Sequence, residues 1–235
     1  MRYLIGFIIL ILHLLVELRR NDMGNDFMCG ADILVSQLET FSFLWGVIIP
    51  VILSHQQITK YTFKYQHVIR VNSWKTILIS QIRKITLVSV LISMVYIMFV
   101  ILYCKWNGVV LYNWDAYDSL FYIYTQKQLG VSGSIVYVYA FICIFLRCVV
   151  INHILLLFLW AFNREILGIL MIFCLMFAEA ILGLKWICRL FVFDYHIWCE
   201  NDERFLMVVQ FVVYVVVAMM VYRYLLLRKK KALCE

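Results

Sequence analysis

The chain has few charged residues and almost no proline. Only 15% of its 235 residues are charged, one is proline, and 65% are hydrophobic, with a mean hydropathy of +0.91. A soluble domain of this length would need far more charge on its surface to remain monomeric. The shortage of charge excludes a soluble globular protein. It indicates an all-α, polytopic membrane protein.

The sequence also lacks the short motifs of common catalytic sites. It contains no HExxH, no GxSxG and no Ser/His/Asp grouping with supporting context. It has no GxxxxGK[ST] phosphate loop either, so any ATP-driven step needs an ATPase on another chain. We therefore expect no catalytic residue and no bound cofactor in this chain.

Cysteines and carboxylates do not form a metal framework in the sequence. The eight cysteines include no CxxC pair. Asp115 and Asp118 have the spacing of an acidic metal motif, but they stand alone in an aromatic loop, so we expect no metal there. Cys188 and Cys199 flank another aromatic segment. A disulfide between them is possible, but free thiols are favoured, because spacing alone does not establish a bond.

Six apolar segments predict six transmembrane helices in a single transmembrane domain, residues 1–235. They lie at residues 3–18, 33–53, 85–104, 134–162, 166–184 and 205–227. The first could be taken for a signal peptide, but no small-residue cleavage site follows it, so we interpret it as a retained helix. The fourth exceeds the roughly 20 residues that a bilayer requires, so it should tilt or protrude.

Positive charge predicts the orientation of these helices. Residues 55–84 carry six Lys or Arg and no Asp or Glu, and four basic residues, 228–231, lie near the end of the chain. Such segments stay in the cytoplasm, so both termini are expected there. The net charge of +7 then points to anionic lipid or a protein partner, and not to nucleic acid. The aromatic segment 185–204 is expected outside, where it could form a helical pair that dips into the outer leaflet.

The basic interval 55–84 contains a second pattern. In residues 58–71, apolar and aromatic side chains recur at every third or fourth position, which predicts a short amphipathic helix. Ser73 is placed to cap a further helix that begins at Trp74. We expect a cytoplasmic helix, a break, and a helix that returns to the bilayer.

Ionisable side chains within the apolar segments are candidate functional groups. They are Glu39, Arg147, His153 and Glu179. Each costs at least about 2.5 kcal/mol if it faces lipid at the membrane centre, so each should face the bundle or a partner. The long side chain of Arg147 can reach outward to Glu39 or Glu179. Such groups either line a translocation path or tie helices together, and the sequence leaves both interpretations open.

The layout and the segment YQHVIRVNSWKTILISQIRK resemble the membrane subunits of ABC exporters, in the ABC-2-type permease class of small Gram-positive peptide and antibiotic exporters. In this class the permease and the ATPase are often separate polypeptides. The resemblance covers the whole chain in topology and the quoted segment in motif. It implies that residues 58–71 form a coupling helix in a groove of the ATPase. The implied contact residues are Ile58, Tyr61, Lys64, Tyr65, His67, Val68, Arg70, Asn72 and Trp74.

The resemblance implies a non-catalytic, multi-pass permease of a bacterial plasma membrane. It would pair with a second permease copy, identical or similar, and with an ABC ATPase that binds the ATP and Mg²⁺. The substrate would be amphipathic or hydrophobic, such as a peptide, a bacteriocin or an antibiotic.

Two other functions remain open at this point. A vitamin-binding subunit of an energy-coupled importer would need a polar external pocket, whereas the outer segments here are aromatic and apolar. A membrane anchor or immunity protein would have no transport activity, and absence of an ATPase partner on purification would favour it.

Overall fold

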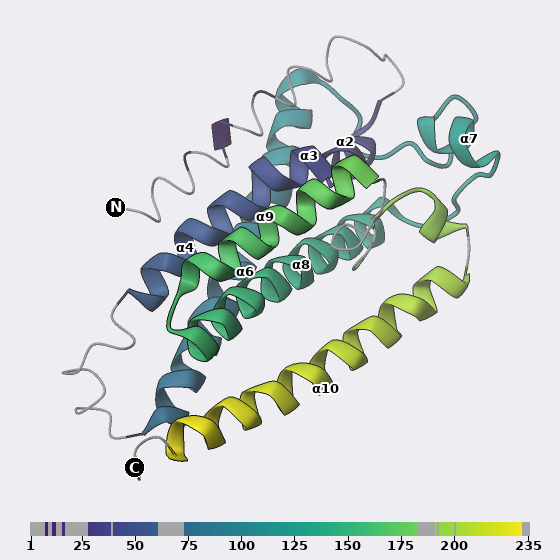
Figure 1. The fold of residues 1–235 in the computed structure, drawn as a ribbon. Helices are drawn as coiled ribbons and strands as arrows, with labels where there is room; N and C mark the ends of the chain where they lie inside the picture. The colour runs from purple at the N-terminus through teal and green to yellow at the C-terminus, as the bar shows by residue number, and fades with distance from the viewer. Residues whose placement is uncertain are drawn as a thin grey trace.

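The computed structural model describes residues 8, 11, 12, 16, 28–38, 40–60, 73–182, 191, 193–199 and 201–231. The ordered elements of these residues are helical (Figure 1). They are α2 (Gly30–Gln37), α3 (Thr40–Phe43), the π-helix η1 (Leu44–Ile48), α4 (Ile49–Thr59), α6 (Trp74–Asn107), α7 (Leu120–Thr125), α8 (Gly133–Phe162), α9 (Glu165–Leu182), the 3-10 helix η2 (His196–Trp198) and α10 (Asn201–Lys231).

The all-α class is confirmed for the described residues. Three helices are long and apolar enough to cross a membrane: α6, α8 and, over Val208–Leu227, α10. Helix α9 contains a shorter apolar stretch, Glu165–Ala178. These helices support a membrane protein, while six spans and cytoplasmic termini stay predictions. The first predicted span, 3–18, lies almost wholly outside the described residues.

Helix α8 forms the centre of the bundle. Its sequence is apolar on every side, which is typical of a helix that is buried all round. Cys143, Ile144, Ile151 and Leu155 are fully buried along it. Helices α4, α6 and α9 all pack against α8, as Figure 1 shows.

Helix α6 begins and ends where local signals place its termini. The Ser73 hydroxyl accepts a hydrogen bond from the Thr76 amide at 3.5 Å, so the predicted cap before Trp74 is confirmed. Gly108 ends the helix in the left-handed conformation, with φ of 70°. Its 34 residues span about 51 Å, beyond the roughly 30 Å of a hydrocarbon core. Part of α6 must therefore extend out of the membrane.

A tight turn joins α8 to α9 in the short gap between the predicted spans 134–162 and 166–184. Asn163 has φ of 56°, and its amide donates to the Leu159 carbonyl at 2.9 Å. Glu165 follows as the first residue of α9. The two helices then pack closely at Gly168, where an added Cβ would lie 3.1 Å from the Phe158 Cβ and 3.3 Å from the Leu155 Cα.

We expect Gly168→Val to lower the free energy of unfolding by about 1–3 kcal/mol, because the larger side chain forces α8 and α9 apart. Gly130→Val is the matched control, since Gly130 is exposed and an added Cβ meets nothing within 4 Å. Thermal unfolding in detergent measures both variants. If both variants lost the same free energy of unfolding, close packing at Gly168 would not explain the destabilisation.

Helix α10 lies beside the bundle rather than within it (Figure 1). Near its start, the Gln210 side chain accepts a hydrogen bond from the Phe191 amide at 3.3 Å. Farther along, Tyr222 and Leu225 are buried against α6 and α8. Most of its other described side chains are exposed and apolar, which fits contact with lipid.

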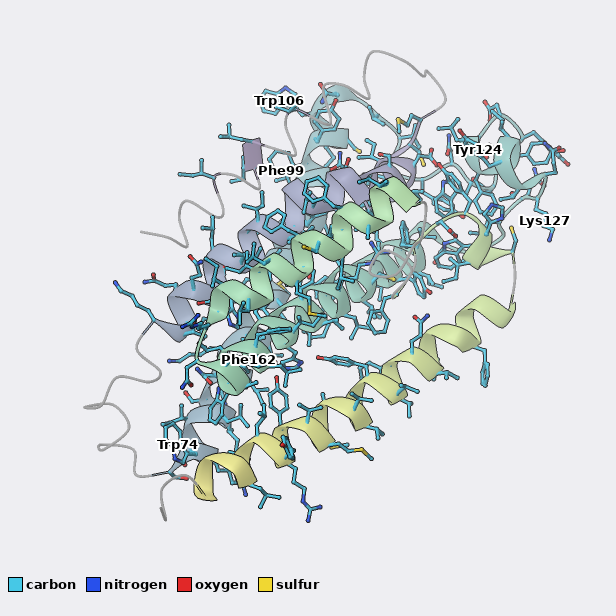
Figure 2. All side chains as sticks on the ribbon, viewed as in Figure 1. Trp74, Phe99, Trp106, Tyr124, Lys127 and Phe162 are labelled. Atoms are coloured by element: carbon cyan, nitrogen blue, oxygen red, sulfur yellow. The ribbon has the colours of Figure 1, made fainter. Side chains whose placement is uncertain are left out.

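The two ends of the bundle differ in chemistry. Helices α4 and α8 stop, α6 and α9 start, and α10 finishes at what we term the basic end, where Trp74 and Phe162 lie in Figure 2. Its exposed cations among the described residues include Lys60, Lys75, Arg83, Lys84, Arg164 and Arg223. The opposite, aromatic end carries Trp106, Tyr124 and Lys127 (Figure 2).

Candidate functional site

At the aromatic end, one buried carboxylate joins three distant chain segments. Asp32 is 1% exposed at the start of α2, and its Oδ2 accepts a hydrogen bond from the Cys29 amide at 2.8 Å. Its Oδ1 accepts from the Trp114 indole at 2.7 Å and from the Tyr195 hydroxyl at 3.0 Å. Burial raises the pKa of Asp32, and the three donors oppose that rise. Burial and the nearby Asp32 also raise the pKa of Tyr195, which keeps its hydroxyl a donor.

Aromatic rings surround this carboxylate. We term the set the aromatic cap: Trp114, Phe121, Phe193, Tyr195 and Trp198. The indole of Trp114 stacks on Phe121 at 4.9 Å and meets Tyr195 and Trp198 edge-on at 5.5 Å and 6.2 Å between ring centroids. Such pairs add to the free energy of burial and fix the geometry of the rings. The arrangement is a structural lock between two loops and α2.

The aromatic cap changes the interpretation of segment 185–204. Its described part forms a turn and the short 3-10 helix η2, and α10 already begins at Asn201. No helical pair occurs among the residues that the structure describes here. Phe193 and Trp198 are buried against Trp114 instead of lipid, because the loop between α6 and α8 supplies a complementary aromatic surface.

Arg147 lies at a break in the second predicted span. That span, 33–53, is not one α-helix, because α2 ends at Gln37 and α3 starts at Thr40. The guanidinium of Arg147 donates to the Leu38 carbonyl at this break at 3.0 Å and lies 5.0 Å from the centroid of the Phe43 ring. The guanidinium thus provides a hydrogen-bond donor for a backbone carbonyl that is exposed by the helix break, in an apolar bundle where water is scarce.

The predicted ion pair of Arg147 stays untested. Glu39 lies outside the described residues, and the side chain of Glu179 on α9 is likewise not described. What the structure adds is that Arg147 reaches Leu38, which directly precedes Glu39 in the sequence.

His153, the other predicted intramembrane group on α8, contacts α10. Its Nδ1 is hydrogen-bonded to the Tyr214 hydroxyl, and the two rings stack at 5.8 Å. The Tyr222 ring meets it edge-on at 5.6 Å. His153 therefore connects α10 to the bundle. Arg147 lies on a different side of α8, where it contacts the helix break at Leu38.

A second polar network lies inside the bundle, in the half nearer the basic end. We term it the inner polar cluster: His55 and Thr59 on α4, Ser89 on α6, Asn152 on α8 and Glu165 on α9. His55 Nδ1 lies 3.1 Å from Asn152 Oδ1, and His55 Nε2 lies 3.9 Å from Glu165 Oε1. Thr59 donates to Glu165 Oε2 at 3.3 Å, and the Asn152 amide donates to Ser89 at 3.4 Å. Four helices meet through these side chains.

The sequence does not single out the inner polar cluster. His55 stands at the start of a polar interval, where a histidine carries no signal. Asn152 is the residue that could have revealed the site, because a carboxamide inside an apolar span requires buried partners. His55, Ser89 and Asn152 are all fully buried, whereas the side chain of Glu165, which begins α9 at the basic end, is 19% exposed.

Two of the predicted coupling residues lie in the described part of the chain. Ile58 on α4 and Trp74 on α6 are half-buried against an apolar cluster that contains Trp160. The indole of Trp74 meets that of Trp160 edge-on at 5.9 Å, and Trp160 donates to Gln81 at 2.8 Å. The other seven lie outside the described residues: Tyr61, Lys64, Tyr65, His67, Val68, Arg70 and Asn72.

The possible disulfide also remains untested. Cys188 lies outside the described residues, whereas Cys199 is half-buried directly after η2.

Comparison with known proteins adds no relative. No family model matches the chain, and no curated protein and no solved structure is significantly similar to it. The function must therefore be inferred from the residues and their geometry.

Proposed function

We propose that the chain is the permease subunit of an ATP-driven ABC exporter whose ATPase is a separate protein. The observation that supports it best is the position of residues 61–72 between α4 and α6. Helix α4 carries His55 and Thr59 close before this segment, and α6 carries Ser89 after it, all within the inner polar cluster. A force applied to the segment would reach buried polar groups through two rigid helices.

The charge of the basic end supports a protein partner on that side. Exposed cations from α4, α6 and the turn before α9 gather there. They suit acidic groups of an ATPase as well as anionic lipid, and they support the proposal that this end lies in the cytoplasm. ATP and Mg²⁺ would be held by the ATPase.

The outer surfaces of the helices favour an amphipathic or hydrophobic substrate. On α6 and α10 the exposed large side chains are mostly apolar, and they include Leu87, Leu91, Met98, Val212 and Met220. A path between two permease copies would thus be apolar along much of its length. This suits a peptide, a bacteriocin or an antibiotic exported across a bacterial plasma membrane.

The test replaces the two predicted anchors of the coupling helix, Tyr65→Ala together with Arg70→Ala. Aromatic and Arg anchors are each worth about 2 kcal/mol or more at an interface, so the double variant should release the ATPase or uncouple hydrolysis from transport. Co-purification of the ATPase from native membranes and the transport rate measure this.

The matched control exchanges an exposed aromatic and basic pair at the opposite end, Tyr124→Ala with Lys127→Ala. It should leave ATPase binding intact. Undiminished binding and transport in the coupling-helix variant would refute the coupling role. Failure of the wild type to retain any ATPase would overturn the transporter and favour an anchor or immunity protein.

A further inference from the structure

The inner polar cluster contains a buried nitrogen that has no hydrogen bond. His55 is fully buried, and its Nε2 has no hydrogen-bond partner among the described residues. The nearest charged atom across from it is Glu165 Oε1, at 3.9 Å. A buried polar atom in this state costs free energy, so the site requires an explanation.

The neighbours of His55 fix which of its nitrogens carries hydrogen. The Asn152 Nδ2 amide lies 3.0 Å from the Cys148 carbonyl and 3.4 Å from the Ser89 hydroxyl, and only an amide nitrogen can donate to that carbonyl. Asn152 Oδ1 therefore faces His55, and because Oδ1 only accepts, His55 Nδ1 must carry the hydrogen.

In a neutral imidazole with hydrogen on Nδ1, Nε2 presents a lone pair. Here that lone pair faces a carboxylate oxygen, so two acceptors oppose each other unless a proton lies between them. We propose that His55 and Glu165 form a binding site for one proton, which joins α4 to the start of α9.

The proton can reside on either partner. On Nε2 it gives an imidazolium beside a carboxylate, and on Oε1 it gives a carboxylic acid that donates to the imidazole. In both cases it comes from solvent at the basic end, where the Glu165 side chain is 19% exposed. Thr59 donates to the second oxygen of Glu165 and so holds the carboxyl group towards His55.

Few other charges act on this site from the neighbouring helices. Helix α8 contributes His153, which interacts electrostatically with His55, and uncharged Asn152. Helix α6 contributes uncharged Ser89. Lys60 at the end of α4 and Arg164 before α9 are both exposed, so solvent screens them. Glu165 is thus the oppositely charged group that the described residues bring against His55.

The proton makes closure of the basic end depend on pH. When α4 and α9 separate, both groups meet water, and above about pH 6.5 the open pair holds no proton. Closure must then take up one proton, so it becomes less favourable as pH rises. This property belongs to the chain alone and does not depend on the proposed ATPase.

The experiment measures the distance between α4 and α9 in the purified protein. Spin labels at Gln57→Cys and Ile166→Cys, in a cysteine-free background, replace no charged residue. Pulsed electron paramagnetic resonance should show a short distance at about pH 5 and a longer one at about pH 9. Glu165→Gln should give the short distance at both values, because its amide can donate to Nε2 permanently.

His153→Gln is the matched control, since it removes a neighbouring buried histidine that is not a member of the inner polar cluster. It should keep the pH dependence and shift only its midpoint, because His153 interacts electrostatically with His55. An invariant distance in the wild type would overturn the proposal, as would a wild-type response in Glu165→Gln. If Glu165→Gln does not fold, ¹⁵N nuclear magnetic resonance of histidine in the wild type decides. A single signal, lost in His55→Gln, must keep hydrogen on Nδ1 while the signal of Nε2 changes between the two pH values, because Nε2 loses either its own proton or the hydrogen bond from the Glu165 carboxylic acid. A signal that does not change would contradict the site.

Discussion

Asp32→Leu should lower the free energy of unfolding by at least about 3 kcal/mol. The substitution removes an acceptor from three buried donors, the Cys29 amide, the Trp114 indole and the Tyr195 hydroxyl. A buried donor that loses its partner costs about 1–3 kcal/mol. Chemical unfolding in detergent, followed by tryptophan fluorescence, measures the loss.

Two further variants test whether the loss of stability comes from the lost hydrogen bonds or from placing leucine in this region. Asp32→Asn keeps Oδ1 as the acceptor for Trp114 and Tyr195 and loses only the bond from Cys29, so it should cost less than the leucine variant. Asp115→Leu changes an exposed carboxylate next to Trp114 and should cost almost nothing. Equal effects of leucine at positions 32 and 115 would refute the lock.

Arg147→Met should destabilise the protein by about 3 kcal/mol. It removes a charged donor from the Leu38 carbonyl and a cation from the face of the Phe43 ring. A hydrogen bond to a charged group contributes about 1.5–3 kcal/mol, and a desolvated cation–π contact up to about 2 kcal/mol. The variant no longer buries a charged group, and the desolvation free energy regained in this way offsets part of the summed loss. Thermal unfolding in detergent measures the change.

Arg147→Lys keeps a charged donor and should lose less. Double variants with Glu39→Gln and Glu179→Gln test the predicted ion pair, since coupled residues lose less together than the sum of the single losses. Strict additivity for both would remove that pair. Full stability of Arg147→Met would show that Arg147 does not support the helix break.

Local sequence predicts much of the fold. Long apolar runs locate α6, α8, α9 and α10, and the predicted cap at Ser73 defines the start of α6. Such a cap is a local signal, because a hydroxyl acts within one turn of the helix.

The break in the second span has no such signal. No glycine or proline occurs at Leu38 or Glu39, and Pro50 lies at the beginning of α4, where a helix accepts it. Arg147, which is 109 residues away, contacts the chain there. Tertiary contact at a distance cannot be predicted from a single sequence.

The same reason explains which site residues the sequence predicts. Burial cost correctly marks Arg147 and His153 as groups that need partners, but it does not identify the partners. The structure adds a backbone carbonyl as a partner of Arg147 and tyrosine rings as partners of His153, while the predicted acidic partners of Arg147 have side chains outside the described part of the structure. His55 is missed because its partner Asn152 lies 97 positions away.

The aromatic cap has a consequence for the order of folding. Asp32 bonds to Trp114 across 82 positions and to Tyr195 across 163, whereas a tight turn joins α8 to α9. The entropy lost on closing a loop grows with its length, and contacts distant in sequence form late. The α8–α9 hairpin should therefore assemble early, and the cap should be among the last parts to form. The indole of Trp114, which meets Asp32 and Tyr195 only when these distant segments come together, marks completion of the fold.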